Sequence, residues 1–228
     1  MKRMIDWMYV VLVLILASLG HSGIARAVEP AELEVQKTWF LIGYEYGEAT
    51  KPKEIQNIID LLCEASAEEL VPLFEKWAKG EVKKAAVRGP LMAFVASKKG
   101  LLVFSACRLG EWVRALENAH FRSFVGILFN DEQMFWKAVE DIMILMAQAQ
   151  EFVDALSQYA PAEVIQTLTD ISGARHDLTF VPIFVAVGGD LPPEKLEEIA
   201  EKIAEAFGNV LLNLPDWVEA IKTAYGVK

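Results

Sequence analysis

The chain has 228 residues, of which 54% are apolar, and it carries a formal net charge of −10. This length suits one domain, or two closely packed halves, with a substantial hydrophobic core. The negative charge argues against nucleic acids and against docking on anionic lipid through charge alone, because both surfaces require a basic protein face.

The first 27 residues have the three parts of a secretory signal. Lys2 and Arg3 form a basic start, residues 7–19 form an apolar run, and Ala25–Ala27 matches a small-residue cleavage site. The uncharged apolar part of the run is shorter than the roughly twenty residues that span a membrane. We therefore expect a cleaved signal, with an uncleaved membrane anchor as the alternative. Residues 28–228 are then one exported domain outside the cytoplasm, either secreted or membrane-anchored.

Helical periodicity dominates the remaining sequence. Leu102, Ala106, Leu109, Val113 and Leu116 are separated by four, three, four and three positions, which places them on one face of a helix. Similar patterns predict an all-α fold, either a multi-helix bundle or an irregular helical array, after the N-terminal signal or anchor helix. The expected helices, some of which merge if the short breaks close, are residues 30–47, 53–64, 67–79, 82–97, 101–118, 120–129, 131–159, 161–171, 179–187, 193–207 and 215–225.

Glycines help to set these boundaries. Gly80, Gly100, Gly173 and Gly208 are expected at helix ends, where glycine readily adopts the left-handed conformation. A helix end near Gly173 places the polar residues 172–177 in a loop.

An α/β fold with a small parallel sheet is the alternative. Residues 101–106, 121–129 and 180–187 are short apolar runs that could be read as strands. The first two runs fit a helical face better than an alternating pattern, and Pro182 would remove a hydrogen-bond donor from the third. The all-α interpretation is therefore preferred.

Cys63 and Cys107 are the two cysteines of the chain. In an exported protein an even number of cysteines allows a disulfide, which would close a loop of about 45 residues and stabilise the fold by roughly 3–4 kcal/mol. Two separate buried thiols are the alternative.

Arg175, His176 and Asp177 form the densest polar cluster beside an apolar segment. As a catalytic site, Arg175 would bind an anion, and Asp177 would orient His176 for proton transfer in a hydrolase. Asp177 could instead simply cap the following helix. The sequence lacks the nucleophile-elbow, zinc-protease and phosphate-loop motifs, so the question of an enzymatic activity stays open.

Glu117 and His120 have the Glu-x-x-His spacing that di-iron bundles use. Such a metal site needs a second pair of this kind, and the sequence contains none. A solvated glutamate beside a helix-end histidine is therefore the preferred interpretation, and we expect no cofactor.

The Phe- and Met-rich stripe over residues 121–146 is expected to lie in the core, with a groove for a partner helix or a lipid as the alternative. High apolar content without catalytic motifs favours an exported helical interaction or assembly module of the cell envelope. It would bind a protein partner, or itself, through apolar helix faces. An extracytoplasmic hydrolase and a carrier of a lipid or other apolar ligand are the alternatives. Membrane contact would occur through the N-terminal segment if that segment is not cleaved.

Overall fold

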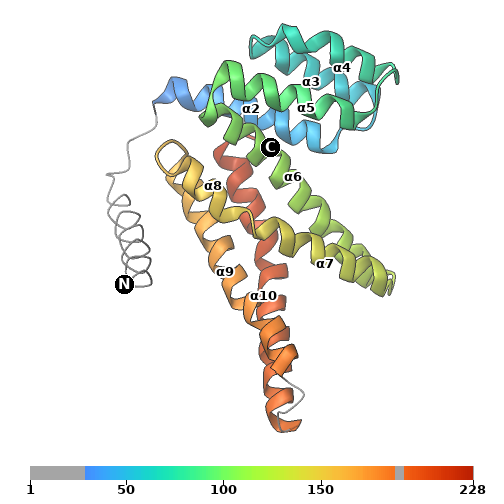
Figure 1. Ribbon diagram of the computed structural model, residues 1–228, viewed down its shortest axis with the longest axis vertical. Coiled ribbons are helices and arrows are strands. Elements are labelled where there is room, and N and C mark those ends of the chain that lie inside the picture. The colour runs from blue at the N-terminus through green and yellow to red at the C-terminus, as the bar shows by residue number, and fades with distance from the viewer. Residues whose placement is uncertain (1–28, 188–192, 228) are drawn as a thin grey trace, which may run out of the picture.

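The computed structural model describes residues 29–187 and 193–227, and within these ranges it leaves undescribed the side chains of residues 176–187, 193–197, 199, 200 and 203. The described chain is an all-α array without a β-strand (Figure 1). None of the described helices is both long enough and apolar enough to cross a membrane. The proposed signal in residues 1–27 lies outside the described residues.

The helices follow one another with short connections. Their bounds are α2 Pro30–Glu48, α3 Pro52–Glu64, the 3-10 turn η1 Glu68–Leu70, α4 Val71–Ala78, α5 Lys84–Phe94, the π-helical turn η2 Val95–Lys99, α6 Leu101–Leu128, α7 Glu132–Met146, α8 Ala149–Leu156, α9 Ala162–Val187 and α10 Pro193–Ala224.

Local chemistry explains several of these boundaries. Helix α3 begins at Pro52, and the Glu54 carboxylate accepts hydrogen bonds from the backbone N–H groups of Thr50 and Lys51 at 2.8 and 2.9 Å. Gly100 separates η2 from α6 with a φ of +90°, a conformation that glycine adopts at little cost. Asp131 caps α7 by accepting a hydrogen bond from the Met134 backbone N–H.

Three long helices replace pairs of predicted shorter ones. Helix α6 continues through residue 119, α9 through residues 172–178 and α10 through residues 208–214, whereas the predicted helix over residues 131–159 divides into α7 and α8. The apolar runs of the α/β alternative lie in α6 and α9, so the all-α prediction is confirmed.

Two hydrophobic cores share helices α2 and α6. One core lies among α2–α5, η2 and the start of α6, and includes Trp39 and Phe74. The other lies among α2 and α6–α10, and includes Phe40 and Tyr225, whose rings stack at 4.4 Å between centroids. The neighbours Trp39 and Phe40 thus enter different cores, which requires α2 to be apolar on more than one face.

Glycines allow the two shared helices to touch. A methyl group on Gly43 of α2 would overlap the Cys107 carbonyl of α6, and one on Gly110 of α6 would overlap the Phe40 carbonyl of α2. The backbones are therefore in direct contact at this crossing, closer than ordinary side chains permit.

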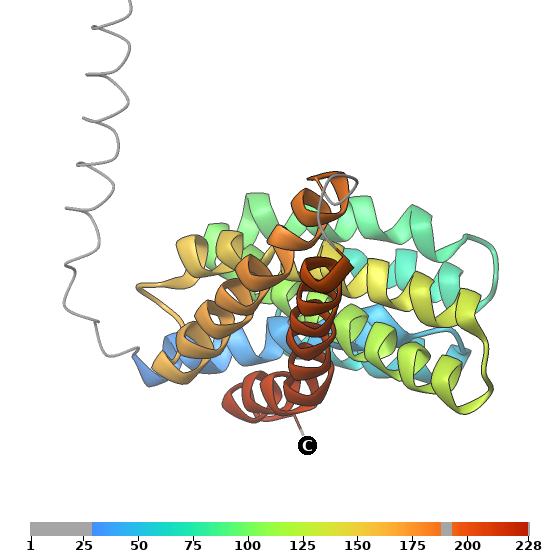
Figure 2. The ribbon, with the colours of Figure 1, turned by 90° about the horizontal axis from the view of Figure 1, so that it is seen from below.

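Two helical hairpins extend from this centre. Figure 1 shows α6 and α7 pointing away from α2–α5, and α9 and α10 forming a second, antiparallel arm. Figure 2 looks along the second arm from below. Helix α10 packs against both α9 and α6, so it joins the two arms near their bases.

Candidate functional site

Helices α6 and α10 line a groove of about 300 Å³, called here the α6/α10 groove. Its lining residues are Glu117, His120, Phe121 and Phe124 of α6 and Leu214, Pro215, Val218 and Glu219 of α10. Leu214 and Val218 are buried, whereas Phe121 is 64% exposed. The groove therefore has an apolar floor and opens to solvent.

The Glu117 carboxylate is held in place at the border of the groove. It accepts hydrogen bonds from Tyr44 Oη at 2.6 Å, Arg114 Nη1 at 2.5 Å and Lys222 Nζ at 3.3 Å. Burial disfavours the charged form of Glu117, but the hydrogen bonds from Tyr44 and Arg114 and the charge of Lys222 outweigh it, so its pKa lies below the ordinary value. Glu117 is thus ionised and already paired.

In the surrounding network the cations are more buried than the outer carboxylates. The side chains of Arg114 and Lys222 are only 13% and 12% exposed, and they lie over the Tyr44 ring. Their further partners, Glu48 for Arg114 and Glu219 for Lys222, are 51% and 63% exposed. This end of the groove therefore presents negative charge to solvent.

His120 compensates for a proline in the opposite wall. In an α-helix the carbonyl of residue 211 accepts from the N–H of residue 215, but Pro215 has no N–H. His120 Nε2 lies 3.1 Å from the Leu211 carbonyl oxygen. Since that oxygen can only accept, Nε2 is the donor of this contact, and His120 replaces the missing helical hydrogen bond.

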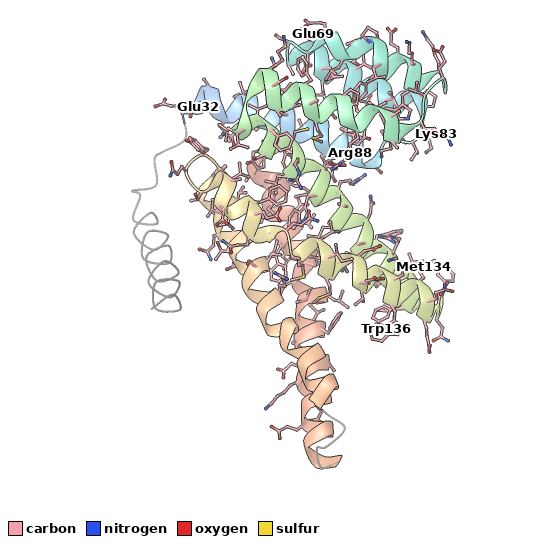
Figure 3. The ribbon with its side chains drawn as sticks, in the orientation of Figure 1. Glu32, Glu69, Lys83, Arg88, Met134 and Trp136 are labelled. Carbon is pink, nitrogen blue, oxygen red and sulfur yellow. The ribbon has the colours of Figure 1, made fainter. Side chains whose placement is uncertain are left out.

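Exposed apolar side chains follow the groove toward the end of the α6–α7 hairpin. The name hairpin-end patch denotes here the exposed residues Phe121, Phe124, Ile127, Leu128, Phe129, Met134 and Trp136, of which Met134 and Trp136 project from different sides of α7. Phe129 is 78% exposed and Trp136 is 62% exposed. Figure 3 shows Met134 and Trp136 near the free end of the hairpin.

The prediction that the stripe over residues 121–146 lies in the core is therefore wrong for its first half. Val139, Ile142 and Met146 of α7 are buried, but Phe121 and Phe124 of α6 are exposed. Helical spacing shows that apolar residues share a face, and it does not show whether another element covers that face.

The predicted metal ligands Glu117 and His120 both line the groove, but each is engaged elsewhere. Glu117 binds Tyr44, Arg114 and Lys222, and His120 binds Leu211. Across the described residues, no group of three or more His, Cys, Asp or Glu side chains is arranged to hold a metal ion.

The predicted catalytic residues Arg175, His176 and Asp177 lie within α9 rather than in a loop. The expected loop over residues 172–177 is wrong, because α9 continues through Gly173. Arg175 is partly buried, and the side chains of His176 and Asp177 lie outside the described part of the chain. Their catalytic role stays a prediction.

The two cysteines are free thiols rather than a disulfide. Cys63 is exposed on α3, and Cys107 is buried on α6. Burial raises the pKa of Cys107 to about 12. The Cys107 thiol is therefore protonated and unreactive at neutral pH, whereas Cys63 is accessible.

Comparisons with models of known protein families, with curated proteins and with solved structures gave no match. The α6/α10 groove offers an apolar surface to a ligand, with the carboxylates of Glu117 and Glu219 at its border.

Proposed function

We propose that this chain is an exported helical interaction module of the cell envelope that binds a protein partner through the hairpin-end patch. The observation that carries the proposal is the exposure of four large aromatic side chains, Phe121, Phe124, Phe129 and Trp136. At their exposed fractions they leave about 500 Å² of apolar surface, because a buried aromatic side chain covers roughly 150–250 Å². Exposed apolar surface of this extent is often functional in monomeric proteins.

Charges at the hairpin end favour a protein partner over a lipid bilayer. Asp131 and Glu132 are exposed between Phe129 and Met134. Inserting the hairpin end into hydrocarbon would bury both carboxylates, and an acidic side chain at the centre of a membrane costs about 2.5–3.5 kcal/mol. A protein surface can accept the apolar residues and leave these carboxylates in water.

Export is supported by residues 1–27. A basic start, an apolar run and a small-residue cleavage site are the features of a secretory signal. Delivery outside the cytoplasm would bring the patch to partners in the envelope.

Site-specific crosslinking in the cells that make the protein tests this function. A photoreactive amino acid replaces Phe129 in the full chain, and in a matched control it replaces Leu101, which is 70% exposed at the other end of α6. We expect one discrete protein adduct at position 129, none at position 101, and recovery of the adduct with the cell envelope.

Equal crosslinking at both positions, or no adduct at position 129, would contradict the interaction role. Recovery of the native chain from the cytosol with residues 1–27 still attached would contradict export.

A further inference from the structure

The α6/α10 groove and the exposed part of α6 form one continuous face. Glu117, His120, Phe121, Phe124 and Leu128 are separated by three, one, three and four positions, so their side chains project from the same side of α6. From Glu117 to Leu128 this face is about 16 Å long, or three helical turns. That length matches the three or four anchors of a helix that binds in a groove.

The α10 wall combines an apolar surface with acidic residues. Leu212 is 76% exposed, and it lies three residues before Pro215 and seven before Glu219, which places all three on one side of α10. Asp216 and Glu219 are exposed. Of these two, Glu219 lines the groove, and it is 63% exposed although it pairs with Lys222 at 3.4 Å. Lys222 is only 12% exposed, so an incoming ligand meets the carboxylate rather than the cation at this end of the groove.

We infer that the groove binds an amphipathic helix of a partner protein, with apolar anchors at positions i, i+3 or i+4, and i+7. A Lys or Arg of that helix, one turn beyond the anchors, would face Glu219. This inference rests on the proposed function and specifies its partner. Complementary charge would orient the helix and favour basic partners over acidic ones.

A second copy of this chain is a poorer occupant. Each copy has a net charge of −10, and the carboxylates that border the groove would face a surface of the same sign. Like charges brought together across an interface oppose association.

Binding of synthetic helices to the full chain tests the inference. The first peptide, of about 18 residues or five turns, has leucines at the anchor spacing and lysines elsewhere. A second peptide has glutamate in place of each lysine. A third has the same composition as the first, in an order that no longer places the leucines on one face of the helix. Anisotropy of a fluorescent label on the peptide reports binding.

We expect the leucine–lysine peptide to bind about tenfold or more tightly than either control peptide. Phe124→Asp should weaken its binding about tenfold or more, and the matched exposed change Leu101→Asp should leave it unchanged. Glu219→Lys should weaken binding of the leucine–lysine peptide and strengthen binding of the peptide that has glutamate in place of lysine. Circular dichroism melts check that each variant is folded.

Equal binding of the scrambled peptide, or insensitivity to Phe124→Asp, would overturn the inference, as would no binding at all. A concentration-dependent dimer lost in Phe124→Asp would assign the face to a second copy. Binding to phosphatidylglycerol vesicles that Phe124→Asp abolishes would assign it to lipid. If the peptides fail while position 129 still gives its protein adduct, the groove assignment falls and the proposed function stands.

Discussion

Gly43 of α2 and Gly110 of α6 lie at a crossing where each occupies space next to the other helix's backbone. A Cβ atom at either position would overlap a backbone carbonyl oxygen rather than the end of a flexible side chain. The two helices that join the cores can therefore approach this closely only because glycine, which has no side chain, occupies both positions.

Gly43→Ala and Gly110→Ala are each expected to lower the free energy of unfolding by about 1–3 kcal/mol or more, because the helices must separate to admit a methyl group. Chemical denaturation of the full chain measures the loss. Gly208→Ala in α10 is the matched control, since a methyl group there meets no atom within 4 Å. It should gain up to about 1 kcal/mol from helix propensity. Equal effects at all three positions would contradict the close crossing.

His120 and Pro215 should be energetically coupled through Leu211. His120→Ala leaves the Leu211 carbonyl without its donor, at a cost of about 1–3 kcal/mol. In a Pro215→Ala background the backbone N–H of residue 215 can serve that carbonyl, so the same change should cost less. A double-mutant cycle of unfolding free energies measures the difference. Strict additivity would show that His120 does not replace the missing hydrogen bond.

The cysteines should differ sharply in reactivity. Iodoacetamide is expected to label Cys63 in the native protein and Cys107 only after unfolding, because Cys107 is buried and its pKa is raised to about 12. Mass spectrometry of the labelled peptides measures both sites. Cys63→Ser should abolish native labelling. A native protein that resists labelling at both sites until a reductant is added would instead contain the disulfide.

Glu54 should make the fold sensitive to acid. Hydrogen bonds from the Thr50 and Lys51 backbones lower its pKa from 4.5 to about 2. A lowered native pKa contributes stability above pH 4.5, and this contribution disappears as the pH falls toward 2. Glu54→Gln cannot titrate, so its melting temperature should fall less than that of the native chain across this range. A carboxyl pKa near 4.5, measured by NMR, would contradict the capping role.

The helical class follows directly from the sequence, and so do the boundaries set by strong local chemistry. Pro30 and Pro52 begin α2 and α3 close to the predicted positions, because proline fits a first helical turn. Gly80 and Gly100 end helical segments with positive φ, as expected, but Gly173 and Gly208 lie inside α9 and α10. Glycine permits a helix end without requiring one, and packing by neighbouring helices decides the outcome.

The candidate site could be predicted only in part. The spacing of Glu117 and His120 correctly places them together on α6, but their partners come from distant parts of the chain. Leu211 lies 91 residues after His120, and Lys222 lies 105 residues after Glu117. A helical period relates residues within one helix, so it cannot pair α6 with α10. Pro215 is the local signal for this contact. Because proline has no N–H, the Leu211 carbonyl needs a hydrogen-bond donor from another part of the chain.

The entry of Trp39 and Phe40 into different cores has a consequence for how the molecule denatures. Melting either core would expose one side of α2 and one part of α6. Because both helices also line the other core, that core would lose part of its packing surface. Intermediates with one half ordered are therefore costly, and the chain is expected to lose its structure in a single cooperative step.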